Sequence, residues 1–260
     1  MGKAFKLATF NCNSVRSRMH IIGPWLSRHR PDALCLQETK AKTEDFPELL
    51  FSELGYNVAC CGLGGHAGVA IVSPHKISKV SFGLLSEPHD EDRLVEAVVE
   101  GVTIVNTYVP QGREVEDEWF AYKLEWFKRL GRHFDEKYTP RKRLAWVGDF
   151  NVAPEQRDVY APEKLLDHVD FHPEARAALG RLRNWGFVDV FRVHNDEAGQ
   201  YSYYDYRAKD PIGKGTGWRV DHIYATKPLA NKSTAAYIDL EPRRAEKPSD
   251  HTFVVAEFEL

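Results

Sequence analysis

Two polar side chains interrupt an apolar segment near the middle of the sequence. Residues 143–147 (RLAWV) look like a strand entering a core, but the chain continues with Gly148, Asp149, Phe150 and Asn151. In an extended chain, side chains two positions apart point to the same face. Asp149 and Asn151 would therefore lie side by side at the end of a buried strand, where they could accept a proton from water or orient it.

Polar residues follow other strand-like segments in the same way. The full set is Asn11, Asn13, Glu38, Tyr108, Asp149, Asn151, Asp221, Asp250 and His251. Some of these have a purely structural interpretation: Asn11 could cap a turn, and Glu38 could be a first-turn acid of a helix. Residues 249–251 could form a cap before the last strand. Asp221 is harder to explain, because a lone carboxylate in an apolar segment is costly to bury without a partner.

The residue types fit metal-assisted hydrolysis of a phosphodiester. Glu38 and nearby asparagines offer hard oxygen ligands that suit Mg²⁺, and no Cys/His cluster favours zinc. Asp149 would activate or orient the attacking water. His251 would stabilise the developing charge if Asp221 holds its other ring nitrogen. Metal-assisted hydrolysis is therefore the predicted reaction class before any family is considered.

Eight apolar segments rich in β-branched or aromatic residues are expected to form the strands that position these side chains. They are residues 5–10, 33–36, 69–72, 94–99, 102–108, 144–147, 220–225 and 253–258. The apolar spacing over residues 120–134 predicts a long helix. Pro173 opens a second helix that stops at Gly186, and Pro24 begins or kinks a third that ends before Pro31.

The two halves of the sequence repeat a strand, helix, strand pattern. LATFN, a helix and ALCLQE in the first half resemble IVNTYVPQG, the long helix and LAWVGDFN in the second. Two sheets packed face to face, with helices outside, would bring all the polar strand ends to one rim. No linker or low-complexity segment interrupts the chain, so we predict one domain over residues 1–260.

Composition excludes several classes of protein. With 43% hydrophobic and 28% charged residues, the chain is globular rather than disordered. It contains no apolar run of about 18 residues and no secretory signal layout, so we expect neither a membrane span nor secretion. Cys12, Cys35, Cys60 and Cys61 lack metal-site spacing and are expected to be free thiols in a reducing cytoplasm. The formal net charge of −3 gives no hint of a nucleic-acid partner.

Seven motifs, in this order across nearly the entire chain, resemble the exonuclease III family of abasic-site (AP) endonucleases in the DNase I-like superfamily of endonucleases, exonucleases and phosphatases. They are TFNCNSVR, LCLQETK, GHAGVAI, NTYVPQG, VGDFNVAP, GWRVDHIY and KPSDH. The resemblance implies an α/β fold of four layers, in which helices flank two packed mixed sheets. It also implies base-excision repair of DNA with Mg²⁺, or Mn²⁺ in its place.

The resemblance assigns roles to the polar strand ends. The metal site would consist of Asn11 and Glu38, with Asn13 and Asp250 near it. The catalytic residues would be Tyr108 at the target phosphate, Asp149 with its orienting neighbour Asn151, and the Asp221–His251 pair at the scissile phosphate. Asp149 would act either as the base that activates water or as the acid that protonates the leaving group.

A substrate pocket is also implied. Tyr203 and Trp218 would form the aromatic walls that accept the flipped-out, baseless sugar, and Val220 would be a small wall beside them. Flipping costs least where the base is already missing, which gives selectivity. Several basic residues are placed on the same rim as phosphate contacts: Arg16, Arg18, Lys40, Lys42, Arg113, Arg207, Lys209, Lys214 and Arg219. The dense basic run of residues 137–143 is interpreted as the solvated end of the long helix.

The predicted function is Mg²⁺-dependent cleavage of DNA on the 5′ side of an abasic site, leaving a 3′-hydroxyl. We also expect 3′–5′ exonuclease and 3′-phosphodiesterase activity, with duplex DNA carrying abasic sites or blocked 3′ ends as partner. The active unit is expected to be a monomer in the cytoplasm of a bacterium or archaeon. The relative strength of these activities, and the use of one or two ions, are left open.

Three alternatives were weighed against this function. A lipid-headgroup phosphatase would share the metal and histidine core, but the aromatic pair Tyr203 and Trp218 and the lack of an apolar membrane-contacting loop count against it. A non-catalytic nucleic-acid-binding regulator would be expected to have lost Glu38, Asp149 or His251, which are all present. A secreted nuclease is disfavoured by the absence of a signal and of paired cysteines.

Overall fold

The computed structural model describes residues 2–260, which form two six-stranded mixed sheets packed face to face. The first sheet has the order β11-β12-β1-β2-β4-β3, with β1 (Ala4–Asn11), β2 (Ala33–Gln37), β3 (Asn57–Cys61), β4 (Val69–Ser73), β11 (Ser233–Asp239) and β12 (Phe253–Glu259). The second has the order β5-β6-β7-β8-β10-β9, with β5 (Ser78–Phe82), β6 (Leu94–Val99), β7 (Val102–Tyr108), β8 (Leu144–Asp149), β9 (Phe187–Asp189) and β10 (Asp221–Thr226).

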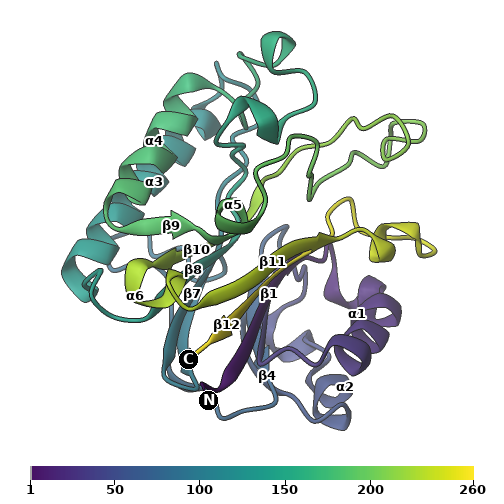
Figure 1. Ribbon diagram of the computed structural model, residues 1–260, viewed down its shortest axis with the longest axis vertical. Helices are drawn as coiled ribbons and strands as arrows, with labels where there is room; N and C mark the ends of the chain where they lie inside the picture. The colour runs from purple at the N-terminus through teal and green to yellow at the C-terminus, as the bar shows by residue number, and fades with distance from the viewer. Residues whose placement is uncertain (1) are drawn as a thin grey trace.

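Helices cover the outer faces of both sheets (Figure 1). The α-helices are α1 (Val15–His29), α2 (Glu48–Glu53), α3 (Glu118–Lys137), α4 (Pro173–Asn184), α5 (Val190–His194) and α6 (Lys227–Ala230), and short 3-10 turns lie at Thr43–Asp45, Gln156–Asp158, Pro162–Lys164 and Glu241–Arg244. In Figure 1, α3 and α4 lie outside the second sheet, and α1 and α2 lie outside the first. The predicted α/β sandwich of four layers is confirmed.

Most strands are buried on both faces, which explains why they read as continuous apolar runs. In β1, Phe5 and Leu7 pack between the two sheets, whereas Ala8 and Phe10 pack toward α1. The long helix α3 packs Phe120, Phe127 and Leu130 against the second sheet. Because both faces of a central strand meet apolar neighbours, alternation of polar and apolar residues is lost there.

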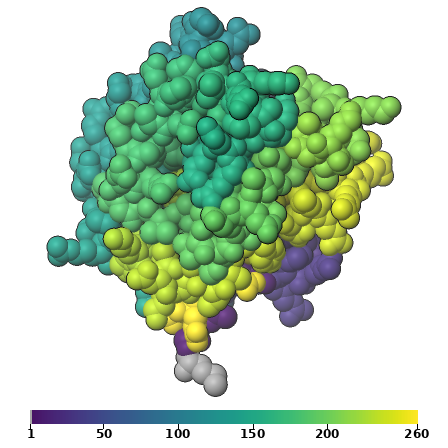
Figure 2. All heavy atoms as spheres, turned by 45° about the horizontal axis from the view of Figure 1, so that its top comes forward, coloured from purple at the N-terminus to yellow at the C-terminus, as the bar shows by residue number. Residues whose placement is uncertain are grey.

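The repeated strand, helix, strand pattern forms two equivalent parallel units. Strands β1 and β2 are parallel and joined by α1, and β7 and β8 are parallel and joined by α3. The carboxyl ends of all four strands therefore reach one rim. Antiparallel β10 adds Asp221 there, since its register places Asp221 opposite Asp149. Figure 2 shows segments from the middle of the chain (green) and from its C-terminal part (yellow) joined in one continuous surface.

The strand predictions were right for central strands and incomplete at the edges. All eight predicted segments are strands, but β3, β5, β9 and β11 were missed. These four are the edge strands of the two sheets. An edge strand has one neighbour and exposes more polar side chains, so its apolar signal is weak. Of the two alternatives for Pro24, the one in which it begins a helix was wrong, because α1 starts at Val15 and Pro24 lies inside it; the helix ends before Pro31, as predicted.

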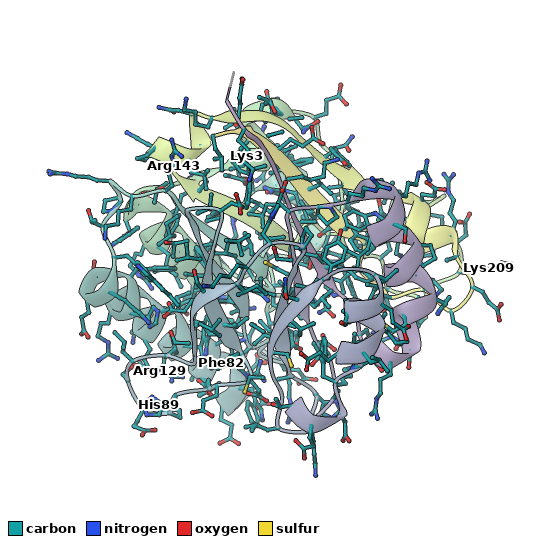
Figure 3. The ribbon with its side chains drawn as sticks, turned by 90° about the horizontal axis from the view of Figure 1, so that it is seen from below. Lys3, Phe82, His89, Arg129, Arg143 and Lys209 are labelled. Atoms are coloured by element: carbon teal, nitrogen blue, oxygen red, sulfur yellow. The ribbon has the colours of Figure 1, made fainter. Side chains whose placement is uncertain are left out.

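The dense basic run of residues 137–143 is largely solvated, as predicted, although Lys137 also pairs with the buried carboxylate of Glu96. Residues 141–143 are exposed, and Figure 3 places Arg143 near Lys3. Lys3 directly precedes β1, so this end of the sandwich is opposite the rim where the polar strand ends meet.

The four cysteines are free thiols within the described range. None of the helices in residues 2–260 is both long and apolar enough to cross a membrane.

Candidate active site

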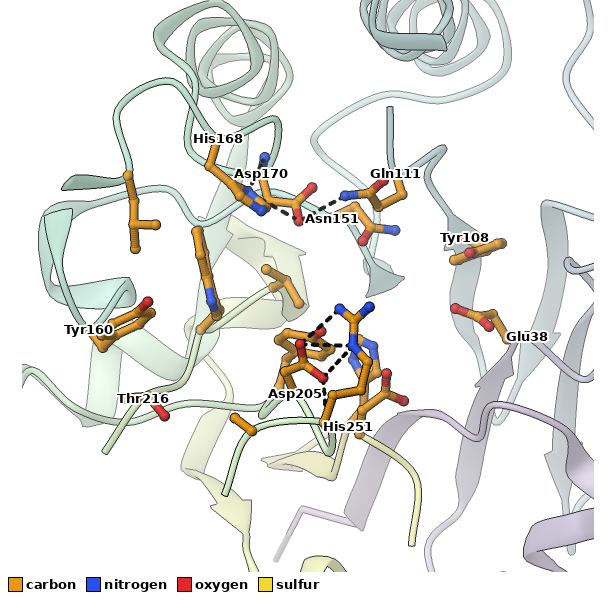
Figure 4. Close-up of a pocket in the computed structure, with 17 residues that line it drawn as sticks. Glu38, Tyr108, Gln111, Asn151, Tyr160, His168, Asp170, Asp205, Thr216 and His251 are labelled. Atoms are coloured by element: carbon orange, nitrogen blue, oxygen red, sulfur yellow. Dashed lines mark hydrogen bonds and ion pairs between the residues drawn. The ribbon is translucent and has the colours of Figure 1, made fainter. Parts of the chain in front are cut away.

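The polar strand ends meet at one cavity of about 530 Å³ (Figure 4). Of the predicted site residues, Glu38, Tyr108, Asn151, Tyr203, Trp218, Val220, Asp250 and His251 line it. Asn11, Asp149 and Asp221 are buried and bonded to these lining residues. The structure therefore brings together side chains from both sheets that are far apart in the sequence.

Asn11 joins the two halves of the site. Its side-chain amide donates to Oε1 of Glu38 over 2.8 Å and to Oδ2 of Asp149 over 2.9 Å. Glu38 follows β2 with φ 48, a left-handed turn that ends the strand. Nζ of Lys40 lies 2.8 Å from the other carboxylate oxygen of Glu38. One amide thus bridges two carboxylates that come from different sheets.

A second asparagine holds Asp250 at the same rim. The side-chain amide of Asn13 donates to Oδ1 of Asp250 over 3.0 Å, and its oxygen accepts from Nζ of Lys40 over 2.7 Å. The backbone N–H of Asn13 donates to Oδ1 of Asn11 over 3.1 Å. The four predicted metal-site residues, Asn11, Asn13, Glu38 and Asp250, therefore form one hydrogen-bonded group with Lys40.

Asp149 is fully enclosed at the end of β8. The backbone N–H of Asn151 donates to its Oδ1 over 2.9 Å, and the Asn151 side chain donates to the carbonyl of Val109 over 2.9 Å. Burial raises the pKa of Asp149 to about 8; His251 and the bond from Asn11 oppose this shift, and Asp221 adds to it. A carboxyl with a pKa near neutrality can both accept and donate a proton.

Tyr108 and Glu38 lie next to one another on one side of the cavity (Figure 4). Burial, together with the carboxylates of Glu38 and Asp149, raises the pKa of Tyr108 well above its ordinary value. The guanidinium of Arg93 lies 4.9 Å from the centre of the Tyr108 ring and opposes that shift. The phenol therefore keeps its proton and acts as a hydrogen-bond donor.

His251 is held between two carboxylates. Its Nδ1 lies 2.8 Å from Oδ2 of Asp221, and its Nε2 lies 3.9 Å from Oδ2 of Asp149. Burial lowers the pKa of His251, but Asp221 and Asp149 outweigh it and raise the pKa to about 10. The hydroxyl of Ser202, a residue that sequence reasoning missed, donates to the same Asp221 oxygen over 2.6 Å. His251 is therefore an oriented, protonated donor at the cavity.

The donor set of the site fits a metal ion. Asp149, Asp221 and His251 offer ligand atoms that all lie within 4.8 Å of one another, although His251 could ligate a cation only after losing the proton that it carries here. The other oxygen of Asp221, Oδ1, is buried and has no hydrogen-bond partner in the described part of the chain. Two buried carboxylates as close together as Asp149 and Asp221 are stable as anions only when a positive charge lies nearby. Glu38 and Asp250 lie outside this cluster, but Asn11 links Glu38 to Asp149.

The predicted pocket walls face the cavity. Tyr203 and Trp218 pair through two backbone hydrogen bonds of 2.9 Å, which set their rings on the same side. The ring of His168 packs against Trp218 with centroids 4.5 Å apart. His168 and Tyr160 were missed because they lie in loops without a periodic pattern.

The prediction of a phosphate-contacting role for Arg219 was wrong. Its side chain is fully buried, with Nε 2.7 Å from Asp158 and Nη2 2.8 Å from Asp189. Trp218 and Val220 face the cavity, so the residue between them points to the opposite side. Alternation along the chain directs Arg219 away from the cavity.

Two other predicted basic residues, Arg113 and Arg207, are exposed; Arg207 lines the cavity and Arg113 does not. The guanidinium of Arg113 lies 4.6 Å from the centre of the Trp119 ring. Arg207 lines the cavity and forms a paired contact with Asp205, with Nε and Nη2 2.9 and 2.8 Å from its carboxylate oxygens. Among residues 2–260, neither Arg113 nor Arg207 forms a buried ion pair like those of Arg219.

Comparison with known proteins agrees with the geometry. The model of the Endonuclease/Exonuclease/phosphatase family matches residues 8–251. The chain is 31% identical over 266 residues to exodeoxyribonuclease III of Haemophilus influenzae, a match that covers 97% of this chain and 99% of that protein. It is 29% identical to an exodeoxyribonuclease of Bacillus subtilis, with 91% of this chain and 94% of that protein covered.

Solved structures give the same result. An AP endonuclease from Archaeoglobus fulgidus matches with a TM-score of 0.97 and 49% identity, covering 98% of this chain and 100% of that one. The 3′ phosphatase NExo from Neisseria, bound to a product DNA hairpin, matches with a TM-score of 0.94 and 34% identity over the same shares of the two chains. The chain belongs to the Endonuclease/Exonuclease/phosphatase family and, within it, to the DNA-repair nucleases of the exonuclease III and AP endonuclease type.

Proposed function

We propose that the protein hydrolyses the DNA backbone on the 5′ side of an abasic site and leaves a 3′-hydroxyl. The observation that carries this proposal is the oriented Asp221–His251 pair beside Asp149, at the base of a cavity walled by Tyr203 and Trp218. The similarity to an AP endonuclease supports the same reaction. The similarity to a 3′ phosphatase bound to DNA supports additional activity at 3′ ends.

The bound cation is proposed to be Mg²⁺, with Mn²⁺ as a substitute. We place it at Glu38 and Asn11, with Asn13 and Asp250 as neighbours, because oxygen donors suit Mg²⁺ and His251 is engaged by Asp221. When bound, the cation would polarise a phosphate oxygen and neutralise developing negative charge. Lys40 now contacts both Glu38 and Asn13, so this group already holds a positive charge.

The chain's own residues supply proton transfer and charge stabilisation. Asp149 exchanges a proton with the attacking water or with the leaving 3′ oxygen, as its pKa of about 8 permits. His251 donates from Nε2 to a non-bridging oxygen of the phosphate, while Asp221 holds Nδ1. Tyr108 donates from its phenol to the same group. Each donor is fixed before substrate binds, so little reorganisation is needed.

The cavity walls explain a preference for abasic DNA. Tyr203 and Trp218 offer flat apolar faces to a deoxyribose turned out of the helix, and Val220 lies beside them. Turning out a nucleotide without a base avoids the cost of unpairing and unstacking. Arg207, which lines the cavity, and Arg113, which is exposed against Trp119, would contact the phosphate backbone.

The proposed active unit is a monomer. The free cysteines support a reducing compartment, and we propose the cytoplasm. Duplex DNA with abasic sites or blocked 3′ ends is the proposed partner.

The test is cleavage of an end-labelled duplex that carries one tetrahydrofuran abasic analogue, beside the same duplex with an intact base. Both are incubated with Mg²⁺ and with EDTA. The expected result is a metal-dependent nick on the 5′ side of the analogue, with a 3′-hydroxyl end. Laddering of the intact duplex measures the exonuclease. An abasic duplex that stays uncut with Mg²⁺ would contradict the proposal.

A further inference from the structure

A lysine is fully buried beneath the cavity, on the inner face of α3. The ammonium nitrogen of Lys123 contacts four oxygen atoms. Three are backbone carbonyls, those of Gln111 at 3.0 Å, Asn151 at 2.6 Å and Val169 at 3.0 Å. The fourth is Oδ1 of Asp170 at 3.1 Å. Lys123 therefore joins α3 to three separate loops through one atom.

Packing of α3 does not require a charged residue at this position. Phe120, Phe127 and Leu130 on the same helix pack into the apolar core without polar contacts of this kind. A buried ammonium costs free energy unless its three N–H donors are satisfied and its charge is paired. Lys123 meets both conditions, since Asp170 pairs its charge and three carbonyls share its donors. The surrounding loops therefore supply a partner for the charge of Lys123 and acceptors for its N–H donors.

Each of the three loops carries part of the cavity wall. Gln111 and Asn151 line the cavity directly, and the third loop supplies His168 and Asp170. Asn151 has φ 48, in the left-handed region that asparagine adopts more readily than most residues, and a side-chain contact holds its carbonyl oxygen. The contact is Nζ of Lys123. The same residue bonds Asp149 through its backbone N–H.

Asp170 extends the contact to the pocket wall. Its second oxygen, Oδ2, lies 3.4 Å from the side-chain nitrogen of Gln111 and 3.7 Å from Nδ1 of His168. Figure 4 shows Gln111, Asp170 and His168 together along one side of the cavity. His168 in turn packs on Trp218. A chain of contacts thus runs from Lys123 to the wall that faces the substrate.

We propose that Lys123, paired with Asp170, is a positioning residue for the nuclease. It fixes the backbone of Asn151 beside Asp149, and it holds Gln111 and His168 in the wall that receives the abasic sugar. The inference rests on the proposed function and extends it to residues that lie behind the reacting groups. Loss of the pair would therefore change turnover and the choice of substrate, beyond any change in stability.

The main variant is Lys123→Met, which keeps the length of the side chain and removes its donors. Asp170→Asn is the milder variant, because it keeps the shape and removes the charge. The double variant completes a thermodynamic cycle.

The matched control is Asp90→Asn. Asp90 pairs with Arg129, six residues further along α3, at 2.9 Å, and Asp90 and Asp170 are each 14% exposed. Figure 3 places Arg129 beside His89, in the same loop as Asp90.

The assay measures kcat and KM for the tetrahydrofuran duplex, and the rate on intact duplex, at a temperature well below each variant's unfolding midpoint. We expect Lys123→Met to lower kcat about 10-fold or more, in the range caused by misplaced catalytic groups. Asp170→Asn should lower the ratio of abasic to intact cleavage several-fold. The double variant should be no worse than Lys123→Met, because the two residues act together. Asp90→Asn should change only the unfolding midpoint.

The outcomes separate this inference from the proposed function. If wild type nicks the abasic duplex and both single variants retain its kcat and its substrate ratio, the positioning role is wrong. If wild type fails to nick that duplex, the proposed function fails, and this inference with it. If Lys123→Met does not fold, Asp170→Asn is the deciding variant. A ratio of abasic to intact cleavage equal to that of Asp90→Asn overturns the inference. A lower ratio in Asp170→Asn than in Asp90→Asn supports it.

Discussion

Asp221 accepts two hydrogen bonds at one carboxylate oxygen, from Nδ1 of His251 over 2.8 Å and from the hydroxyl of Ser202 over 2.6 Å. The Ser202 hydroxyl oxygen also accepts the backbone N–H of Val220 over 3.2 Å and that of Asp221 over 3.1 Å. The carboxylate that orients His251 is therefore itself oriented by the loop that carries Ser202. Groups that orient a catalytic or metal-bound histidine affect its function strongly.

Ser202→Ala should lower kcat for the abasic duplex about 10-fold, because Asp221 would lose the bond that fixes its angle toward His251. KM should change little, since Ser202 is fully buried and does not reach the substrate. Steady-state kinetics check this expectation, with Ser202→Thr as the control that keeps the hydroxyl. Equal kcat in the alanine and threonine variants would show that the bond has no effect on His251.

Asp149→Asn should lower turnover by about 100-fold or more, which is the range for loss of a general acid or base. Binding of abasic DNA should persist, because the amide keeps the shape of the side chain and the cavity walls are unchanged. Single-turnover rates and a filter-binding or anisotropy titration measure the two effects separately. Near-normal turnover would remove Asp149 from the mechanism.

Glu38→Gln should raise the Mg²⁺ concentration needed for half-maximal rate, because a carboxylate that suits the cation is replaced by a neutral amide. The bond from Asn11 can still form to the amide oxygen, so the fold should be preserved. A Mg²⁺ titration of the rate, repeated with Mn²⁺, measures the shift. An unaltered titration curve would place the cation away from Glu38.

Trp218→Ala should reduce the preference for abasic over intact duplex, since it removes the largest flat wall of the cavity. The buried ion pairs of the adjacent Arg219 should survive, because that side chain points the other way. Competition between labelled abasic and intact duplexes gives the ratio directly. If the ratio is unchanged, the sugar is bound at another wall.

Acid should destabilise the protein through His133, which lies on α3 and does not line the cavity. Burial lowers the pKa of His133 from its ordinary 6.5 to about 4, against a weak opposing effect of Glu136. Its Nδ1 is buried without a partner among residues 2–260, so a proton there would be an unsatisfied donor. Nε2 lies 3.1 Å from Glu96, to which the neutral ring donates; Lys137 also pairs with that carboxylate, which weakens its tendency to raise the pKa of His133.

The direction in which folding stability changes with pH follows from the pKa of His133 in the folded and unfolded states. Because the unfolded state binds this proton more readily, stability is fully present above pH 6.5 and is lost as the pH falls toward 4. His133→Gln keeps a donor for Glu96 and cannot titrate. Thermal unfolding at pH 7.5 and pH 5 should therefore show a smaller drop in midpoint for the variant than for wild type. Parallel drops would assign the acid sensitivity to other groups.

Much of the fold could be predicted because central strands and amphipathic helices leave local signals. Residues 144–147 were recognisable as a strand since both of its faces are buried, and the apolar face of α3 repeats at helical spacing. The edge strands could not be recognised, because SKVSF in β5 and STAAYID in β11 carry exposed polar residues. Their pairing depends on neighbours that are distant in the sequence.

The sequence by itself determined which side chains are able to do chemistry, because Asp149 and Asn151, or Asp250 and His251, stand in short motifs at strand ends. Only the tertiary structure decided how these groups meet. The register of β10 against β8 sets Asp221 opposite Asp149, and the packing of one sheet on the other lets Asn11 reach both Glu38 and Asp149.

The tertiary structure also decided the roles of residues that carry no motif. Ser202 and Lys123 act through contacts with residues distant in the sequence, and Arg219 turns inward because its neighbours turn outward. Such contacts depend on how loops and sheets pack, and no local pattern of residue types encodes them. Local periodicity fixes strands, helices and their polar ends, whereas long-range packing fixes which of these ends share one cavity.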